Sequence, residues 1–125
     1  MSAEFSDGRV PADLRMRTTQ FALRIIRLFG ALPSSTEAQV LGKQLLRCGT
    51  SVGAQYREGC RARSGPEFVS KLQSALQEID ETAYWLELLE QSGMVPASKL
   101  VSLRQEADEL IAIFVTCIKN AKQRA

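Results

Sequence analysis

Five basic residues of this chain fall in a span that could hold phosphate groups. Guanidinium groups bind phosphate oxygens through paired hydrogen bonds, and the sequence from Ser64 to Glu67 that follows the span predicts a helix N-terminus, whose dipole also favours anions. The span therefore predicts contact with RNA or DNA. Its basic residues are Lys43, Arg47, Arg57, Arg61 and Arg63.

The charge along the chain leaves a second interpretation open. Residues 1–63 hold ten Lys and Arg against five Asp and Glu, whereas residues 64–125 hold six against nine. This asymmetry is compatible with an anionic partner for the first half, and equally with packing of one half against the other. The alternative is a purely protein-binding scaffold, in which the same arginines pair with the acidic segment 78–90 of an adjacent subunit.

The residue types limit catalysis more strongly than they limit binding. The chain has no histidine, which removes the usual general base and the imidazole metal ligand. Carboxylate and Mg²⁺ chemistry remains, because Glu78-x-x-Glu81 and Glu106-x-x-Glu109 resemble the acidic motifs of all-α nucleotide pyrophosphohydrolases. Helical spacing does not direct the two pairs toward one pocket, so we expect no enzyme, no metal and no cofactor, with the hydrolase as a minor alternative.

Polar residues also interrupt the apolar faces of the predicted helices. At about 100° per residue, Gln44, Ser51 and Gln55 point nearly the same way as the apolar residues around them, and they predict a polar layer that fixes helix register or lines a groove. Glu106 projects near Leu103 and Leu110, where an unpaired carboxylate is costly to bury. We expect an arginine partner for Glu106 from the second helix, Arg47 or Arg57.

Four amphipathic helices position these side chains. Apolar residues recur at helical spacing from about residue 14 to 32, 35 to 58, 67 to 91 and 96 to 122, with breaks at Pro33, Gly59 and Gly93. The serines at 34 and 64, each with Glu three residues later, form capping-box patterns, and Gly59 sits where a helix end favours positive φ. Short connections between long helices predict an all-α, antiparallel up-down-up-down four-helix bundle over residues 13–125, after a loose leader at residues 1–12.

One side of the third predicted helix does not fit an isolated bundle. Tyr84, Trp85 and Leu88 lie on the face turned away from its apolar stripe, and Met16, Leu23 and Leu46 also point outward from their helices. Three large apolar groups on one face favour a contact with another subunit. The sequence therefore predicts a homo-oligomer.

Composition is that of a single folded domain. The chain has 125 residues, 45% of them hydrophobic, with a net charge of +2 and three widely spaced cysteines. An odd number of cysteines without a Cys-x-x-Cys pair indicates a reducing cytoplasm. No apolar run approaches the roughly 20 residues that cross a bilayer, so we expect no membrane partner.

The motifs of this chain, taken together, also identify a relative. They are Gln44-Leu45-Leu46-Arg47, Ser51-Val52-Gly53-Ala54, Tyr56-Arg57-Glu58-Gly59, Arg61-Ala62-Arg63-Ser64, Glu67-Phe68, Lys71-Leu72 and the run from Glu78 to Leu89. The combination covers about residues 14–122. It resembles the bacterial four-helix-bundle family named after proteins encoded in intervening sequences of 23S rRNA genes.

That resemblance implies a cytoplasmic four-helix bundle, a ring-shaped homopentamer and no enzymatic activity. The family is similar to accessory proteins of diversity-generating retroelements, which are basic pentamers that engage nucleic acid and a reverse transcriptase. By analogy, this similarity favours nucleic-acid contact and allows a protein partner of the same kind. Gln55 stands where many members carry Asn.

Overall fold

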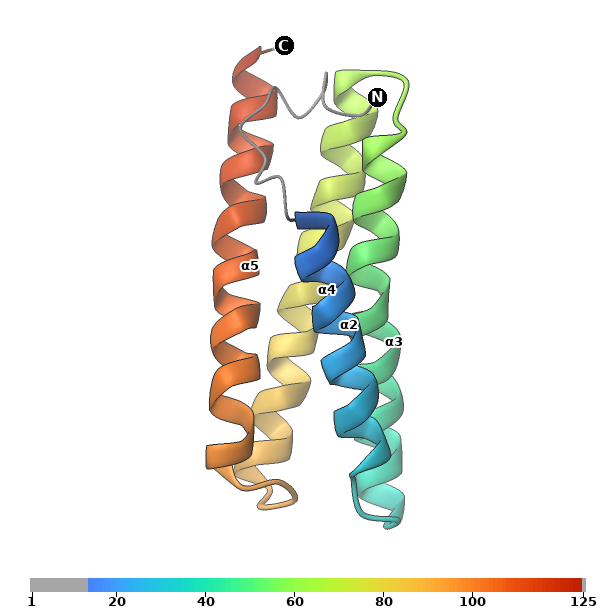
Figure 1. The fold of residues 1–125 in the computed structure, drawn as a ribbon, viewed down its shortest axis with the longest axis vertical. Coiled ribbons are helices and arrows are strands. Elements are labelled where there is room, and N and C mark those ends of the chain that lie inside the picture. Colours follow the sequence, from blue (N-terminus) through green and yellow to red (C-terminus); the bar gives the residue numbers. More distant parts are fainter. Residues whose placement is uncertain (1–13, 125) are drawn as a thin grey trace.

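The structure, a computed structural model, describes residues 14–124, which form four long helices and no strand. Consecutive helices run in opposite directions, so the bundle is up-down-up-down as predicted (Figure 1). The predicted leader at residues 1–12 lies outside the described residues. The helices are α2 (Leu14–Gly30), α3 (Thr36–Cys60), α4 (Gly65–Gln91) and α5 (Ala97–Arg124).

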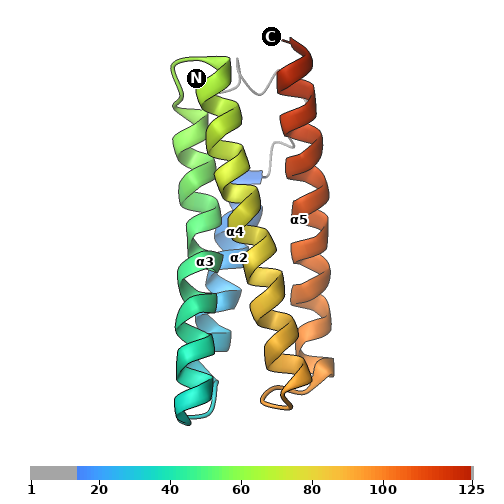
Figure 2. The ribbon, with the colours of Figure 1, turned by 180° about the vertical axis from the view of Figure 1, so that it is seen from behind.

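The four helices do not contact one another equally. α3 packs along both α2 and α4, and α4 packs along α5, whereas α2 meets α5 at only a few residues. α2 is also the shortest helix, so the described part of the bundle has three helices at the end where α3 turns into α4 (Figure 2). No helix within residues 14–124 is both long and apolar enough to cross a membrane.

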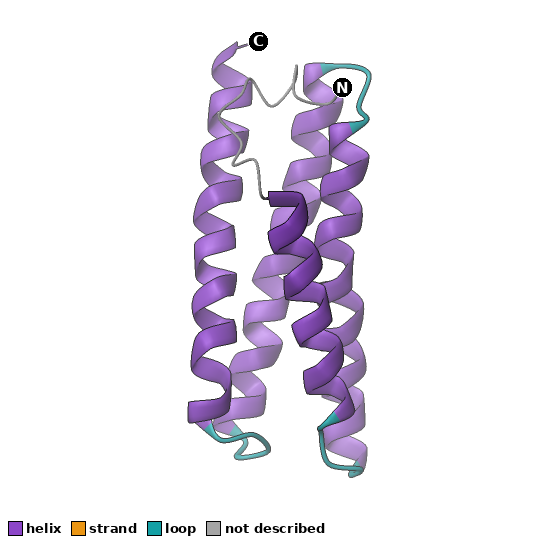
Figure 3. Ribbon diagram, viewed as in Figure 1, coloured by secondary structure: helices purple, strands orange, loops and turns teal. Residues whose placement is uncertain are grey.

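Short turns connect the helices (Figure 3). Serine side chains cap the N-termini of two helices, α3 and α4. Ser64 caps α4 as predicted, because its Oγ accepts a hydrogen bond from the backbone N–H of Glu67 at 3.2 Å. The cap of α3 is Ser35, which accepts from the N–H of Ala38, so the predicted cap at Ser34 is wrong by one residue.

Gly59 does not end α3 with a positive φ as predicted. The helix continues to Cys60, and the backbone N–H of Arg61 donates to carbonyls of the last turn without a left-handed residue. A Cβ at position 59 would lie 2.8 Å from Leu72 Cδ1 and 3.2 Å from Lys71 Cβ. Gly59 is therefore required for the close approach of α4 to α3 rather than for chain reversal.

One continuous apolar core runs through the bundle. Each helix contributes residues at the predicted helical spacing, and burial of their side chains is the main favourable contribution to folding. The face of α3 that packs against α2 differs from the rest of the core, because it carries the buried glycines Gly42, Gly49 and Gly53. α2 therefore lies close against the backbone of α3. The largest buried aromatic side chains are Phe21, Phe68 and Phe114.

Candidate nucleic-acid interface

The five basic residues predicted to contact phosphate do not form one cluster. Lys43 and Arg47 lie in the first half of α3, and Arg57 lies in its last turn, about 21 Å from Lys43 along the helix. Arg61 and Arg63 lie beyond the end of α3, in the turn that leads into α4. The predicted site therefore separates into two parts, of which the turn is the more compact.

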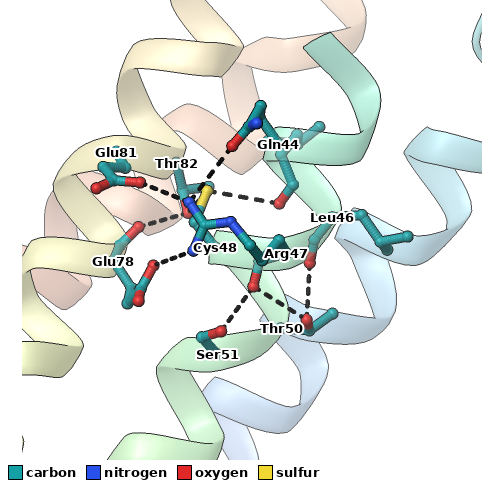
Figure 4. A network of polar contacts seen from close by, with 10 residues as sticks. Gln44, Leu46, Arg47, Cys48, Thr50, Ser51, Glu78, Glu81 and Thr82 are labelled. Atoms are coloured by element: carbon teal, nitrogen blue, oxygen red, sulfur yellow. Dashed lines mark hydrogen bonds and ion pairs between the residues drawn. The ribbon is translucent and has the colours of Figure 1, made fainter. Parts of the chain in front are cut away.

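Arg47 is occupied by two carboxylates of its own chain. Its Nη2 donates to Glu81 Oε1 at 3.0 Å, and its Nη1 lies 3.6 Å from Glu78 Oε1 (Figure 4). The hydrogen bond to Glu81 raises the pKa of Arg47. The protein-scaffold interpretation placed this pairing between subunits, but for Arg47 it joins α3 to α4 within one chain.

Two of the five predicted cations, Arg61 and Arg63, lie in the turn between α3 and α4. The side chains of Arg61 and Arg63 are exposed and make no ion pair with any residue in the described range. Of the two nearby carboxylates, Glu58 binds Lys71 Nζ at 2.8 Å, whereas Glu67 lies at the turn and accepts a hydrogen bond from the backbone N–H of Arg63 at 3.2 Å without pairing with either guanidinium group. Both guanidinium groups are thus free for an external anion.

The two remaining cations differ from each other. Arg57 donates through Nη2 to Thr19 Oγ1 on α2, at 3.0 Å, which leaves its charge uncompensated but fixes its position. Lys43 is exposed and far from the turn. Of the predicted residues, Arg57, Arg61 and Arg63 can therefore serve one surface, whereas Lys43 and Arg47 cannot join it.

The predicted polar layer inside the bundle does not form. Gln44 is exposed, Gln55 is only half-buried, and Ser51 donates to the carbonyl of Arg47 in its own helix at 2.7 Å. The cause is the buried glycines of α3, which draw the inner face of the helix toward α2 and turn these polar residues outward. The fully buried polar residues are instead Thr18 and Thr82.

Thr82 shows how a buried hydroxyl is satisfied within this core. Its Oγ1 donates to the carbonyl of Glu78 at 2.7 Å and lies 3.2 Å from the sulfur of Cys48 (Figure 4). The thiol of Cys48 in turn donates to the carbonyl of Leu45, and burial raises the pKa of Cys48. This small network is structural, because it lies inside the bundle between α3 and α4.

Glu106 has an arginine partner, but not from the predicted helix. Arg17 on α2 binds both of its oxygens, with Nε to Oε2 at 3.0 Å and Nη2 to Oε1 at 2.7 Å. Arg17 Nη2 also donates to Glu109 at 2.9 Å. The prediction of Arg47 or Arg57 is wrong because α5 meets α2 here, while those arginines project toward α4 and toward Thr19. The hydrogen bonds that Arg17 donates to Glu106 raise the pKa of Arg17.

We expect Glu106→Gln to lower the free energy of unfolding by about 1–2 kcal/mol, because a neutral amide cannot accept both charge-assisted bonds. Urea unfolding followed by circular dichroism, at fixed protein concentration, measures the change. Glu109→Gln is the matched control, since its side chain is 52% exposed against 20% for Glu106, and it should cost less than about 0.5 kcal/mol. Equal costs for the two variants would contradict the assignment.

The two predicted Mg²⁺ motifs face different helices. Glu78 and Glu81 contact Arg47 of α3, whereas Glu106 and Glu109 contact Arg17 of α2. Within the described residues, no group of three or more His, Cys, Asp or Glu side chains could hold a metal ion. Each Glu pair in this structure binds an arginine.

The outward apolar residues are only partly as predicted. Tyr84 is 53% exposed, and its ring lies 5.2 Å from that of Trp85, which itself packs against the core. Leu88 and Leu46 are half-buried, and Leu46 packs against the core. The predicted exposure of Trp85, Leu88 and Leu46 is therefore wrong, because all three are only partly exposed. The exposed residues of this set are Met16, Leu23 and Tyr84.

Comparisons with known proteins agree with the fold. The model of the family described as 23S rRNA-intervening sequence protein matches residues 13–116. A solved structure from Bacteroides thetaiotaomicron, described as a protein with unknown function from the S23 ribosomal protein family, is 36% identical in sequence with a TM-score of 0.80. The similarity covers 84% of this chain and 97% of that one. No curated protein matches the sequence.

Proposed function

The chain belongs to the 23S rRNA-intervening sequence protein family, and on that premise we propose that it is a non-catalytic, self-associating bundle that contacts RNA or another nucleic acid. The observation that supports this proposal best is the pair Arg61 and Arg63 in the α3–α4 turn. Both are exposed, neither has a carboxylate partner within residues 14–124, and the N-terminus of α4 follows directly. Such an arrangement attracts phosphate through the two guanidinium charges and the dipole of α4.

A non-catalytic role is supported by the state of the carboxylates. Both Glu pairs that could have served Mg²⁺ chemistry bind arginines, and the chain has no histidine to act as a general base. The three cysteines are buried and form no disulfide within the described residues, which supports a role in the reducing cytoplasm rather than in an oxidising compartment.

Self-association is supported by apolar side chains that remain exposed on an isolated chain. Met16, Leu23 and Ile26 of α2 are 64%, 38% and 47% exposed and recur at helical spacing, and Tyr84 of α4 is exposed as well. The resemblance implies a ring-shaped homopentamer. Light scattering should then give five times the 13.8 kDa mass of the chain, and a particle of 13.8 kDa at micromolar concentration would refute self-association.

We expect Arg61→Ala combined with Arg63→Ala to weaken binding of a single-stranded RNA about tenfold or more, because two phosphate contacts are removed. The slope of log affinity against log salt should also fall by about 1.4, since each phosphate contact of a single strand contributes roughly 0.7. Fluorescence anisotropy with a labelled oligonucleotide, repeated with single-stranded DNA, measures both quantities.

The matched control removes the same number of charges elsewhere. Lys43→Ala combined with Arg47→Ala should affect RNA binding less, since Arg47 is already paired and both lie away from the turn. Equal losses for the two double variants would show that the turn is not the interface. If the turn variant instead breaks up the oligomer, the alternative function, a protein-binding scaffold, is favoured.

A further inference from the structure

A second basic region lies toward the opposite end of the bundle from the α3–α4 turn, between the last turns of α2 and the first turns of α5, where α2 diverges from α5 (Figure 1). A cleft of about 370 Å³ opens there between the two helices. Its lining contains three cations, two leucines and no carboxylate: Arg24, Arg27, Leu28, Lys99 and Leu103.

The cations of this cleft differ from three other basic side chains that meet a neighbouring helix. Arg17, Arg47 and Arg104 each bind carboxylates across a helix–helix contact. Arg24, Arg27 and Lys99 form no ion pair with any residue from 14 to 124. The helix α2 has no Asp or Glu of its own that could compensate them. The positive charge in the cleft is therefore available to an anion.

Lys99 is placed where helix stability alone would not put it. It lies in the first turn of α5, which contains no acidic residue, and a cation at this end opposes the helix dipole. Arg27 lies in the last turn of α2, where a cation stabilises the helix, so its position has a structural explanation. The position of Lys99 beside Arg24 and Arg27 has no such structural explanation. A bound anion would provide one.

The cleft is also partly organised before any ligand arrives. Arg24 is half-buried, and its Nη2 donates to Ser102 Oγ on α5 at 2.8 Å, which holds the guanidinium against α5. Leu103 is 5% exposed, so part of the cleft wall is apolar and screens the charges less than open water does. One positioned guanidinium beside the two exposed cations Arg27 and Lys99 provides the charge and the hydrogen-bond donors that a phosphate group requires.

We propose that this cleft binds a phosphate group of an anionic ligand. The proposal extends the proposed function with a phosphate contact separate from Arg61 and Arg63, and it rests on that function only for the identity of the natural ligand. The phosphate can come from a nucleic-acid backbone or from a small phosphate ester. Both sources share the chemistry that Arg24, Arg27 and Lys99 recognise.

The test is titration with inorganic phosphate at constant ionic strength, with chloride as the balancing ion. Amide chemical shifts of residues 24–28 and 97–103 should change in the wild-type protein, and its melting temperature should rise more than in chloride alone. Lys99→Gln should weaken phosphate binding about tenfold or more, and Arg27→Gln should do the same. Without phosphate, Lys99→Gln should be at least as stable as the wild type.

Lys119→Gln is the matched control, because it removes an exposed lysine from the other end of α5. It should keep the phosphate response of the wild type. Unchanged phosphate binding in Lys99→Gln and Arg27→Gln, or shift changes confined to other residues, would overturn the proposal.

Two further arms identify the source of the phosphate. If the natural ligand is a nucleic acid, Lys99→Gln weakens the binding of single-stranded RNA, as the turn variant does. If the natural ligand is a small phosphate ester, Lys99→Gln weakens the binding of AMP and leaves RNA binding unchanged. Either result supports the cleft as a phosphate site. Should RNA binding depend on Arg61 and Arg63 while no phosphate ligand depends on Lys99, the cleft proposal fails and the proposed function stands. If phosphate binding depends on Lys99 but RNA binding does not depend on Arg61 and Arg63, the cleft proposal stands and the proposed function fails.

Discussion

Phe114→Ala should lower the free energy of unfolding by about 3–5 kcal/mol, one of the largest losses that a single substitution in this chain can cause. Phe114 is fully buried in the middle of α5, and its ring meets Tyr56 of α3 edge to face with the centroids 6.0 Å apart. Truncation removes the apolar contacts and leaves a cavity that the surrounding helices fill only in part. Urea unfolding followed by circular dichroism, at fixed protein concentration, measures the loss.

The neighbouring position provides the control for this prediction. Val115 is 47% exposed on the same helix, so Val115→Ala should cost less than about 0.5 kcal/mol. A loss for Phe114→Ala no greater than for Val115→Ala would mean that α5 does not pack through this face. A change in the slope of the denaturation curve would instead indicate that the folding transition is no longer two-state.

The apolar periodicity predicted the helices because the same residues make the core. Phe68, Leu72 and Ile79 of α4 recur at the spacing of one helix face, and all three are buried. Proline, glycine and capping serines then located the breaks to within a few residues. The arrangement of α2 on α3 was harder to predict, because Gly42 and Gly49 add nothing to an apolar periodicity although they are buried.

The pairing of charges could not be predicted from helical spacing. Spacing gives the direction of a side chain on its own helix, but the partner depends on which helices are neighbours and on their axial offset. Glu106 has an arginine partner as predicted, but spacing alone does not identify Arg17, because the contact depends on α2 lying beside α5 at this level of the bundle. The cleft at Arg24 and Lys99 was missed for the same reason, since its two helices are far apart in the sequence.

The contact of α2 with α3 depends on Gly49, and Gly49→Leu should destabilise the bundle by about 2–3 kcal/mol. A Cβ at this position would lie 2.8 Å from Cγ1 and 3.0 Å from Cγ2 of Ile25, distances that require a displacement. Ile25 is fully buried and branched at Cβ, so it has little freedom to move away. Leucine favours helix over glycine by roughly 0.5–1 kcal/mol, so the measured loss understates the steric cost.

Gly30→Leu separates the steric effect from the change in helix propensity, because a Cβ at Gly30 meets no atom within 4 Å. It should leave the stability within about 1 kcal/mol of the wild type. Amide hydrogen exchange adds a local measurement: Gly49→Leu should speed exchange along α2 more than along α4, since α2 contacts the bundle mainly through α3. Unchanged stability with unchanged protection of α2 would show that α2 does not lie against the backbone of α3. That result would also undermine the explanation given for the outward orientation of Gln44 and Gln55, because the close approach of α2 is what turns them away from the core.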